Sequence, residues 1–464
     1  MQIIFYLLIF AYINHYEMAF NDFYSNKIIL APMVRMNTLP FRLIALEQGA
    51  DIVYSEEIID HKLLRCQRRY NELLDVIEYI DKTDGNVIFQ TCSKEKGKVI
   101  LQIGTSCADR AARVASIMQQ DVAGIDINMG CPKHFSVSGG MGAALLSNKE
   151  TAQKIIQNVK KSVSIPVTCK IRVLGTIEET ISFCKLMEES GVSAIAIHGR
   201  TIKERPHNQN RDSYIEAIAK ELSVPVIANG GSNDIESYED IIKFRKVTNC
   251  SSVMVARSAQ YNCSVFNKDT HLELDDMIKL YLKYAIDYDN FFSNTKYCIQ
   301  SMLRELQDTR RGKQFLETAT VEQISEIWNM SDYYHEKKQE MKTKLSQLKE
   351  ENVAGHQAKK LKIENDTSTL DAIFIRNNYQ NQDDLPKSVL LRFSKKNKMP
   401  TPKYETRNSE KLFQATVLVD GKKYASTRWV KNKKFAEQEA ALVCLCFLKV
   451  YDENEMRRKG LITS

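Results

Sequence analysis

The sequence IDINMGCPK occupies residues 125–133 of this 464-residue chain. Apolar and polar residues alternate up to Asn128, which predicts a strand, and a Gly-Cys-Pro turn follows it directly. A strand that ends in this way places a carboxamide and a thiol at the edge of a sheet. Asn128 is then a hydrogen-bonding group for the edge of a planar ring, and Cys131 is a candidate proton donor. A half-buried structural role for Cys131 is the alternative, because free cysteine often behaves as a small hydrophobe.

Between residues 27 and 258, apolar runs alternate with amphipathic stretches of helical period. Eight strands separated by helices predict an α/β fold of the (β/α)8 TIM-barrel type, although an open doubly wound sheet has the same local signature. No Gly-x-Gly-x-x-Gly follows an early strand, which disfavours a dinucleotide-binding sheet. A further strand at 87–90 is expected to pair with 99–102 as a hairpin insertion. The eight predicted strands span 27–32, 51–55, 99–104, 124–128, 166–172, 194–198, 225–229 and 252–256.

Seven of these eight strands contribute residues to one rim, because the carboxyl ends of barrel strands meet on one face. The backbone amides of the Gly230–Gly231 pair, together with Arg257, suit a phosphate between the last two strands. Lys170 and His198 can reach the ring edge or the phosphate of the same ligand, and Gln102 offers both a donor and an acceptor to a heterocycle. A flat ring with a phosphate indicates flavin mononucleotide (FMN), whose electronics a nearby lysine would tune.

Seven short segments at the strand ends form a recognisable ordered set. They are APMVR (31–35), LQIG (101–104), DINMGCPK (126–133), CKIR (169–172), IHGR (197–200), ANGG (228–231) and MVAR (254–257). This set resembles the tRNA-dihydrouridine synthases, and the resemblance runs from about residue 27 to residue 340. It implies a barrel followed by a helical domain. It also implies FMN as cofactor, NADPH as reductant and tRNA as partner, because the family reduces uridine in tRNA with these cofactors.

By this resemblance Cys131 is the catalytic proton donor. Hydride would add to C6 of the uracil, and C5 would then take a proton from the opposite face. A thiol with a pKa of about 8.5 is mostly protonated at neutral pH, so it can serve as this acid. The target base must leave its stack to enter a barrel mouth. The expected substrate contacts are Asn128, Lys133, Arg172 and Arg200.

The resemblance also assigns the cofactor contacts to matching positions of this chain. Pro32, Met33 and Val34 are expected along the flavin ring. Gln102 and Lys170 are expected at the edge of that ring. The expected phosphate contacts are His198, Asn229, Gly230, Gly231, Ala256 and Arg257.

The positive charge of the chain is confined to its C-terminal end. Residues 386–464 contain 18 Lys and Arg against 8 Asp and Glu, whereas the rest of the chain is slightly acidic. This distribution is typical of a module that binds a polyanion. The segment resembles a double-stranded-RNA-binding domain of α-β-β-β-α order. Its expected elements are a helix at 388–396, strands at 403–407, 413–419 and 422–428, and a second helix from 431.

Three lysines at the start of that second helix, Lys431, Lys433 and Lys434, are the expected RNA contacts. The segment departs from the family pattern at Arg392 and Phe393, where polar residues are usual. Residues 408–410 also lack the usual Gly-Pro and His. These departures favour a folded tRNA over long duplex RNA. A barrel followed by such a domain is the arrangement of the eukaryotic tRNA-dihydrouridine(20) synthase branch, which implies a D-loop uridine as the target.

Eleven cysteines without a Cys-x-x-Cys pair disfavour both zinc and a disulfide framework. A reducing compartment, the cytoplasm, is therefore expected. A monomer is expected as well. The apolar run at 3–13 is shorter than the roughly 20 residues that span a bilayer, so membrane binding is expected only if residues 1–17 act as an anchor. The predicted parts are an apolar extension (1–17), a catalytic barrel (18–265), a helical domain (266–350), a linker (351–385), an RNA-binding domain (386–452) and a tail (453–464).

Two other functions are compatible with parts of this pattern. A free-pyrimidine flavin oxidoreductase of the dihydroorotate-dehydrogenase type shares the cofactor logic, but the basic C-terminal segment disfavours it. A non-catalytic RNA-binding scaffold would need no polar rim, so the strand ends disfavour that alternative.

Overall fold

The computed structural model describes residues 23–83, 85–231, 233–356, 367–374, 379, 381–409, 412–430, 432–459 and 461–463. The chain forms two compact units that divide between Leu348 and Lys349. The predicted extension at 1–17 and the predicted RNA contact Lys431 lie outside the described residues. Within the described residues, no helix has the length and apolar character that crossing a bilayer requires.

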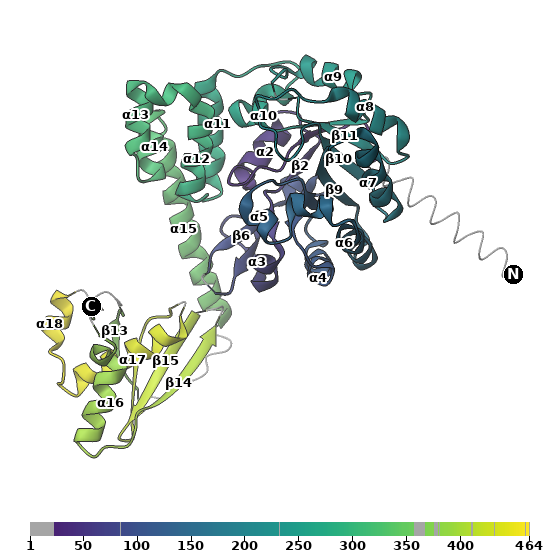
Figure 1. Cartoon of the computed structure of the whole chain (residues 1–464). Coiled ribbons are helices and arrows are strands. Elements are labelled where there is room, and N and C mark those ends of the chain that lie inside the picture. The colour runs from purple at the N-terminus through teal and green to yellow at the C-terminus, as the bar shows by residue number, and fades with distance from the viewer. Residues whose placement is uncertain are drawn as a thin grey trace. The chain divides into compact units, whose positions relative to one another are not determined.

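The first unit contains the predicted barrel (Figure 1). Among the described residues, eight parallel strands form a closed ring, because β2 pairs with β1 on one side and with β7 on the other. This closure confirms the barrel and excludes the open sheet. The strands are β1 (Ile28–Leu30), β2 (Ile52–Tyr54), β7 (Val99–Gly104), β8 (Gly124–Met129), β9 (Val167–Arg172), β10 (Ala194–His198), β11 (Val226–Asn229) and β12 (Ser252–Val255).

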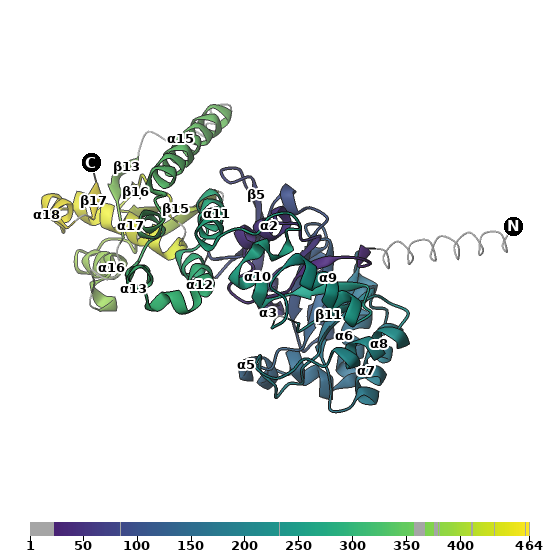
Figure 2. The ribbon, with the colours of Figure 1, turned by 90° about the horizontal axis from the view of Figure 1, so that it is seen from above.

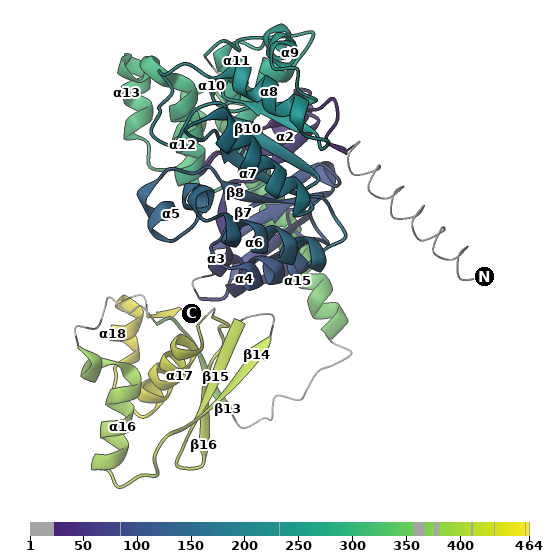
Figure 3. The ribbon, with the colours of Figure 1, turned by 45° about the vertical axis from the view of Figure 1, so that its right-hand side comes forward.

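Helices lie around the outside of this ring (Figure 3). The larger ones are α2 (Leu39–Glu47), α4 (Ala108–Met118), α6 (Lys149–Ser162), α7 (Ile177–Glu189), α8 (Asp212–Glu221) and α9 (Tyr238–Val247). Shorter ones follow strand ends: α3 (Asp60–Arg65), α5 (His134–Ser138) and α10 (Arg257–Tyr261). Because successive side chains of a strand point to opposite faces, alternate residues of each barrel strand belong to two different apolar clusters. On β10, for example, Ala194 and Ala196 belong to a small apolar cluster, whereas Ile195 and Ile197 belong to the large cluster shared with the helices.

The prediction that the strand at 87–90 pairs with 99–102 as a hairpin is wrong, because this strand has a different partner. Strand β6 (Val87–Thr91) pairs with β5 (Val76–Asp81), which pairs in turn with β4 (Cys66–Asn71) in a separate antiparallel sheet. The reason is that β7 has no free edge, since β2 and β3 (Ile58–Ile59) occupy one side and β8 the other.

A group of helices follows the barrel within the first unit, as the sequence resemblance implies (Figure 2). Trp328 and Phe315 meet edge to face with ring centroids 5.7 Å apart, and both are fully buried among these helices. The helices are α11 (Leu274–Asp287), α12 (Phe292–Leu303), α13 (Arg310–Glu317), α14 (Val321–Ile327) and α15 (Ser331–His356), the last of which crosses the division between the units.

The second unit has the predicted α-β-β-β-α core, in which α17 packs against β15 and β16. A strand inside the segment predicted as a linker, β13, pairs in parallel with β16. The segment predicted as a tail contributes α18 and β17, and β17 pairs with β13. The elements are β13 (Thr367–Ala372), α16 (Pro386–Lys396), β14 (Lys403–Ser409), β15 (Leu412–Val419), β16 (Lys422–Ser426), α17 (Lys433–Phe447), α18 (Glu453–Arg458) and β17 (Ile462–Thr463).

Candidate active site

A buried polar network spans three neighbouring barrel strands. The Asp126 carboxylate on β8 accepts hydrogen bonds from Gln102 Nε2 on β7, at 2.8 Å, and from Thr168 Oγ1 on β9, at 2.7 Å. Asn128 Nδ2 donates to Gln102 Oε1 at 3.1 Å. Because Asp126 only accepts when ionised, it sets the orientation of the Gln102 amide, and this amide in turn sets the orientation of Asn128.

Asn128 fixes the loop that carries the thiol. Its Oδ1 accepts from the backbone N–H groups of Gly130 and Cys131, both at 3.0 Å. Arg172 Nε donates to the Gly130 carbonyl at 3.0 Å, and the Ala143 N–H donates to the Cys131 carbonyl at 3.0 Å. The backbone around the half-buried Cys131 is therefore held by Asn128 on β8, by Arg172 on β9 and by the Ala143 N–H.

The Cys131 thiol lies in an environment that keeps it protonated. Burial raises its pKa, the Lys133 backbone lowers it, and the negative charge of Glu57 raises it further. The net pKa lies above the ordinary value, so the sulfur is an acid rather than an activated nucleophile.

Asp126 and Glu57 are residues that sequence reasoning missed. Asp126 precedes Asn128 by two positions on β8, so the strand alternation could have placed it on the same face. Glu57 follows β2, the strand whose end contributed nothing to the predicted rim. Its approach to Cys131 depends on barrel closure and has no local signal.

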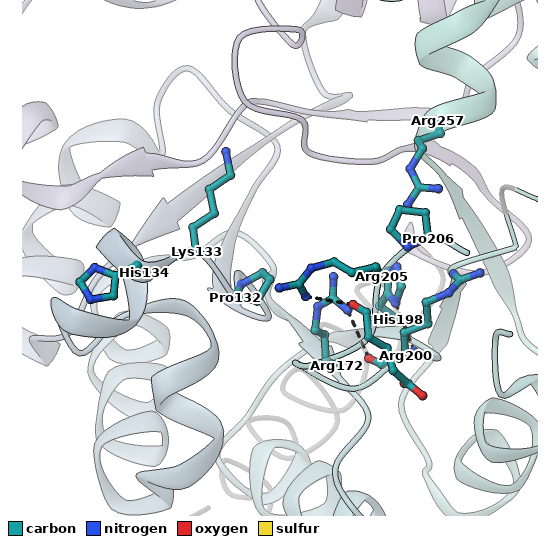
Figure 4. A pocket seen from close by; sticks show the side chains of 10 residues that line it. Pro132, Lys133, His134, Arg172, His198, Arg200, Arg205, Pro206 and Arg257 are labelled. Carbon is teal, nitrogen blue, oxygen red and sulfur yellow. Dashed lines mark hydrogen bonds between the residues drawn. The ribbon is translucent and has the colours of Figure 1, made fainter. Parts of the chain in front are cut away.

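A cationic cavity of about 550 Å³ opens beside this loop, within the size range of ligand pockets (Figure 4). Figure 4 shows Lys133 and His134 on one side and a group of arginines on the other. Four predicted contacts besides Lys133 line the cavity, namely Arg172, His198, Arg200 and Arg257. The remaining lining residues are Pro132, Glu204, Arg205 and Pro206.

Two of these arginines also hold the cavity walls. Arg200 is 3% exposed and donates to the carbonyls of Asn208 and Gly230, each at 2.6 Å. Arg172 donates to the Thr201 carbonyl at 2.9 Å, in addition to the loop before Cys131. Both guanidinium groups therefore donate some of their hydrogen bonds to backbone carbonyls of the protein itself.

His198 is positioned as a neutral donor. Burial, followed by the nearby charges of Lys170, Arg172, Arg200 and Arg257, lowers its pKa well below the usual value. The Arg200 backbone N–H donates to its Nδ1 at 3.2 Å, which places the proton of the neutral ring on Nε2.

The glycine pair after β11 leaves no room for a side chain. Gly230 has φ +112°, and a Cβ there would lie 2.1 Å from Asn210 Oδ1, itself a buried oxygen without a hydrogen-bond partner among the described residues. Asn229, at the end of β11, is buried and donates through Nδ2 to the Met254 carbonyl at 2.8 Å.

The other predicted cofactor contacts lie at the same end of the barrel. Residues 32–34 lie one residue beyond the end of β1, and Ala256 directly follows β12. Lys170 lies opposite Asn128 in the register of β9 with β8. Burial, and then the charge of Arg172, lowers the Lys170 pKa to about 8. Five of the predicted residues thus line one cavity, and the others lie in the same barrel, at or near the carboxyl ends of its strands. Their individual roles stay predictions.

Asp126 gives a pH-dependent prediction. Burial raises its pKa from 3.8 to about 6, against hydrogen bonds from Gln102 and Thr168 that lower it. The folded state then binds more protons than the unfolded state between these values, so this group stabilises the fold below about pH 4 and the contribution is lost as pH rises through about 6.

We therefore expect the wild-type free energy of unfolding to lose on the order of 2–3 kcal/mol relative to Asp126→Asn as pH rises from about 4 to about 7. Urea unfolding at several pH values measures this difference. A parallel pH dependence of the two proteins would contradict it.

In the second unit, the predicted lysines lie at the start of α17. Asn432 caps this helix, since its Oδ1 accepts from the Lys434 N–H at 2.8 Å, and both Lys433 and Lys434 are exposed. Exposed cations at the amino end of a helix suit phosphate groups.

Comparison with known proteins agrees with both units. Residues 29–367 match the dihydrouridine synthase (Dus) family, and residues 386–448 match the double-stranded RNA binding motif. The tRNA-dihydrouridine(20) synthase (NAD(P)+) of Schizosaccharomyces pombe is 36% identical over 291 residues, which cover 61% of this chain and 60% of that protein. The match therefore spans less than two thirds of that relative.

The tRNA-dihydrouridine(20) synthase (NAD(P)+) of Saccharomyces cerevisiae is 34% identical over 299 residues, covering 60% of this chain and 78% of that protein. A crystal structure of a tRNA-dihydrouridine(20) synthase double-stranded-RNA-binding domain is similar to the C-terminal part. It is 39% identical, covers 18% of this chain and 88% of that one, and has a TM-score of 0.17.

Proposed function

The chain belongs to the dihydrouridine synthase family, and we propose that it reduces a uridine of tRNA to dihydrouridine, with FMN as bound cofactor and NADPH as reductant. The observation that carries this proposal is the position of Cys131. A half-buried thiol, whose pKa is raised by burial, lies on a loop held by hydrogen bonds beside a cationic cavity at the carboxyl ends of the barrel strands. The names of the two yeast relatives support position 20 of the tRNA as the target.

The residues around the cavity fit FMN. A phosphate is matched by the Arg257 guanidinium and the neutral His198 ring, which line the cavity. The side-chain-free backbone at Gly230 lies next to them, since its carbonyl accepts from the lining residue Arg200. Gln102 and Lys170 would contact the ring edge. When bound, FMN would supply the hydride for C6 of the uracil and be restored by NADPH.

The protein's own contribution to the reaction is to place the acid. The Cys131 S–H would donate its proton to C5 of the uracil, which leaves a thiolate. Asn128 Oδ1 fixes the loop by accepting hydrogen bonds from the backbone N–H groups of Gly130 and Cys131. The second hydrogen of its amide group can then contact the base. Arg172 holds the Gly130 carbonyl, so the loop does not need to reorganise when the base enters.

This function is tested with purified protein, FMN, NADPH and an unmodified tRNA transcript, with dihydrouridine mapped by mass spectrometry. Dihydrouridine at position 20 is the expected product. Turnover of free uridine or orotate without tRNA would instead favour the free-pyrimidine reductase. Absence of bound flavin would favour the RNA-binding scaffold.

The second unit is expected to supply part of the tRNA affinity. Replacing Lys433 and Lys434 together by Gln should weaken tRNA binding, because two phosphate contacts are lost, and should reduce the slope of log K against log salt by about 1.5. Fluorescence anisotropy at several salt concentrations measures both effects. Lys459→Gln is the matched control, since this exposed lysine already pairs with Glu455 in α18. An unchanged slope in the double variant would refute the role of the two lysines.

A further inference from the structure

A carboxylate lies against the thiol of the candidate acid. Glu57 directly precedes β3, which pairs with β7, and β7 pairs with β8, the strand that leads to Cys131. Burial raises the Glu57 pKa above its ordinary value, although the Cys131 thiol and then the charge of Lys133 act to lower it. The carboxylate charge acts in return on the thiol. Two groups from distant parts of the chain thus affect each other's protonation.

The absence of a side chain at Gly104 leaves space for this carboxylate. A Cβ at Gly104, the last residue of β7, would lie 2.6 Å from Glu57 Oε1 and 3.3 Å from its Cδ. Glu57 Oε1 is buried and has no hydrogen-bond partner within the described part of the chain. An oxygen that is buried without a partner costs stability, so its retention beside the thiol calls for a functional explanation.

Each turnover of the proposed reaction consumes the proton of Cys131. We propose that Glu57 is the proton relay that reloads the Cys131 thiolate after every turnover. This inference rests on the proposed function, because it requires Cys131 to act as an acid.

The steps balance in protons. The Cys131 S–H bond breaks as C5 of the uracil is protonated, and a thiolate then stands beside the Glu57 carboxylate. Two adjacent negative charges raise the proton affinity of the pair. A proton from water binds the carboxylate, and the Glu57 O–H bond then breaks as the S–H bond forms again. The base covers the substrate-facing side of the sulfur during the reaction, so a neighbouring carboxyl group gives the proton a second route.

Other charged groups face this pair and set its titration. Lys133 lies near both members, Asp126 acts on Glu57, and Lys170 and Arg172 interact with Cys131. Lys133 favours an ionised Glu57 carboxylate between turnovers, which is the form that takes up the solvent proton.

The decisive experiment compares the first turnover with later ones in Glu57→Gln. Pre-reduced holoenzyme carries a loaded thiol, so we expect the first dihydrouridine to form at nearly the wild-type rate. Later turnovers with NADPH should slow on the order of tenfold or more, because the relay is lost. Equal slowing of first and later turnovers would indicate a structural role and overturn the relay. Unchanged later turnovers would overturn it as well.

Two further variants sharpen this test. Glu56→Gln is the matched control, because its carboxylate accepts from the Arg35 backbone N–H and not from the thiol. Gly104→Ala keeps every charge but displaces the Glu57 carboxylate, so it should also slow later turnovers selectively. Formate added to Glu57→Ala should restore part of the rate, since a small carboxylic acid can occupy the space of the lost group.

Alkylation of Cys131 gives a readout that does not depend on activity. Removing the negative charge in Glu57→Gln should make iodoacetamide labelling at neutral pH several-fold faster, because the thiolate is the reacting species. An unchanged labelling profile would show that the two groups do not titrate together and overturn the relay alone. Absence of dihydrouridine from the wild-type reaction would instead overturn the proposed function, and the relay with it.

Discussion

Replacing Cys131 with alanine is expected to lower dihydrouridine formation by about 10²- to 10⁴-fold, the usual contribution of a positioned acid. FMN binding and NADPH oxidation should stay near wild-type levels, because the predicted cofactor contacts lie on other strand ends. Stopped-flow absorbance of the flavin and mass spectrometry of the tRNA separate the two effects.

A suitable control for this experiment is Cys107→Ala. Cys107 is another half-buried free cysteine of the barrel unit, but it lies before α4, where its backbone N–H donates to Thr105 Oγ1. This variant should retain normal activity. Normal product from Cys131→Ala would refute the acid role, and loss of flavin from that variant would show that the thiol supports the cofactor site instead.

Gly230→Ala is expected to abolish FMN retention during purification and to raise the Kd of FMN at least tenfold. Its φ of +112° disfavours any side chain, and the new Cβ would lie 2.1 Å from Asn210 Oδ1. The loop must therefore move, and it is held by Arg200, which donates to the Gly230 carbonyl beside the proposed phosphate site. Flavin absorbance of the purified protein and a fluorescence titration measure the loss.

A second glycine variant tests whether backbone strain alone causes the loss of FMN binding. Gly97 has φ +74° but open space at the Cβ position, so Gly97→Ala should cost stability of about 1 kcal/mol without affecting FMN. Adding Asn210→Ala to Gly230→Ala removes the clashing atoms and should recover part of the flavin affinity. Full affinity in the single variant would show that FMN phosphate binds elsewhere.

The barrel strands and the order of residues at their ends could be read from local spacing. Strand β10 was predicted with its observed bounds, 194–198, and β7 likewise at 99–104. These agreements have one cause: the period of two along a strand and the turn residues after it are properties of neighbouring residues. The same locality placed Asn128 and Cys131 together, because a single turn connects them.

Pairings between distant segments could not be read in this way. The sequence of β6 is equally suited to pairing with β7 or β5, and only the occupied edges of β7 exclude the first. Strand β13 has no strong apolar alternation, and its strand conformation depends on the open edge of β16. Edge availability is a property of the assembled sheet.

The thiol loop shows the same division within the site itself. The identity of Cys131 as the candidate acid followed from its own neighbours in the chain. Its pairing with Glu57 follows from closure of the barrel through β2 and β7, which places the end of β2 near the end of β8. Local spacing therefore determined which groups this protein presents at its strand ends. Ring closure decided which of these groups affect each other's pKa, because a pKa responds to charges near in space and not to distance along the chain.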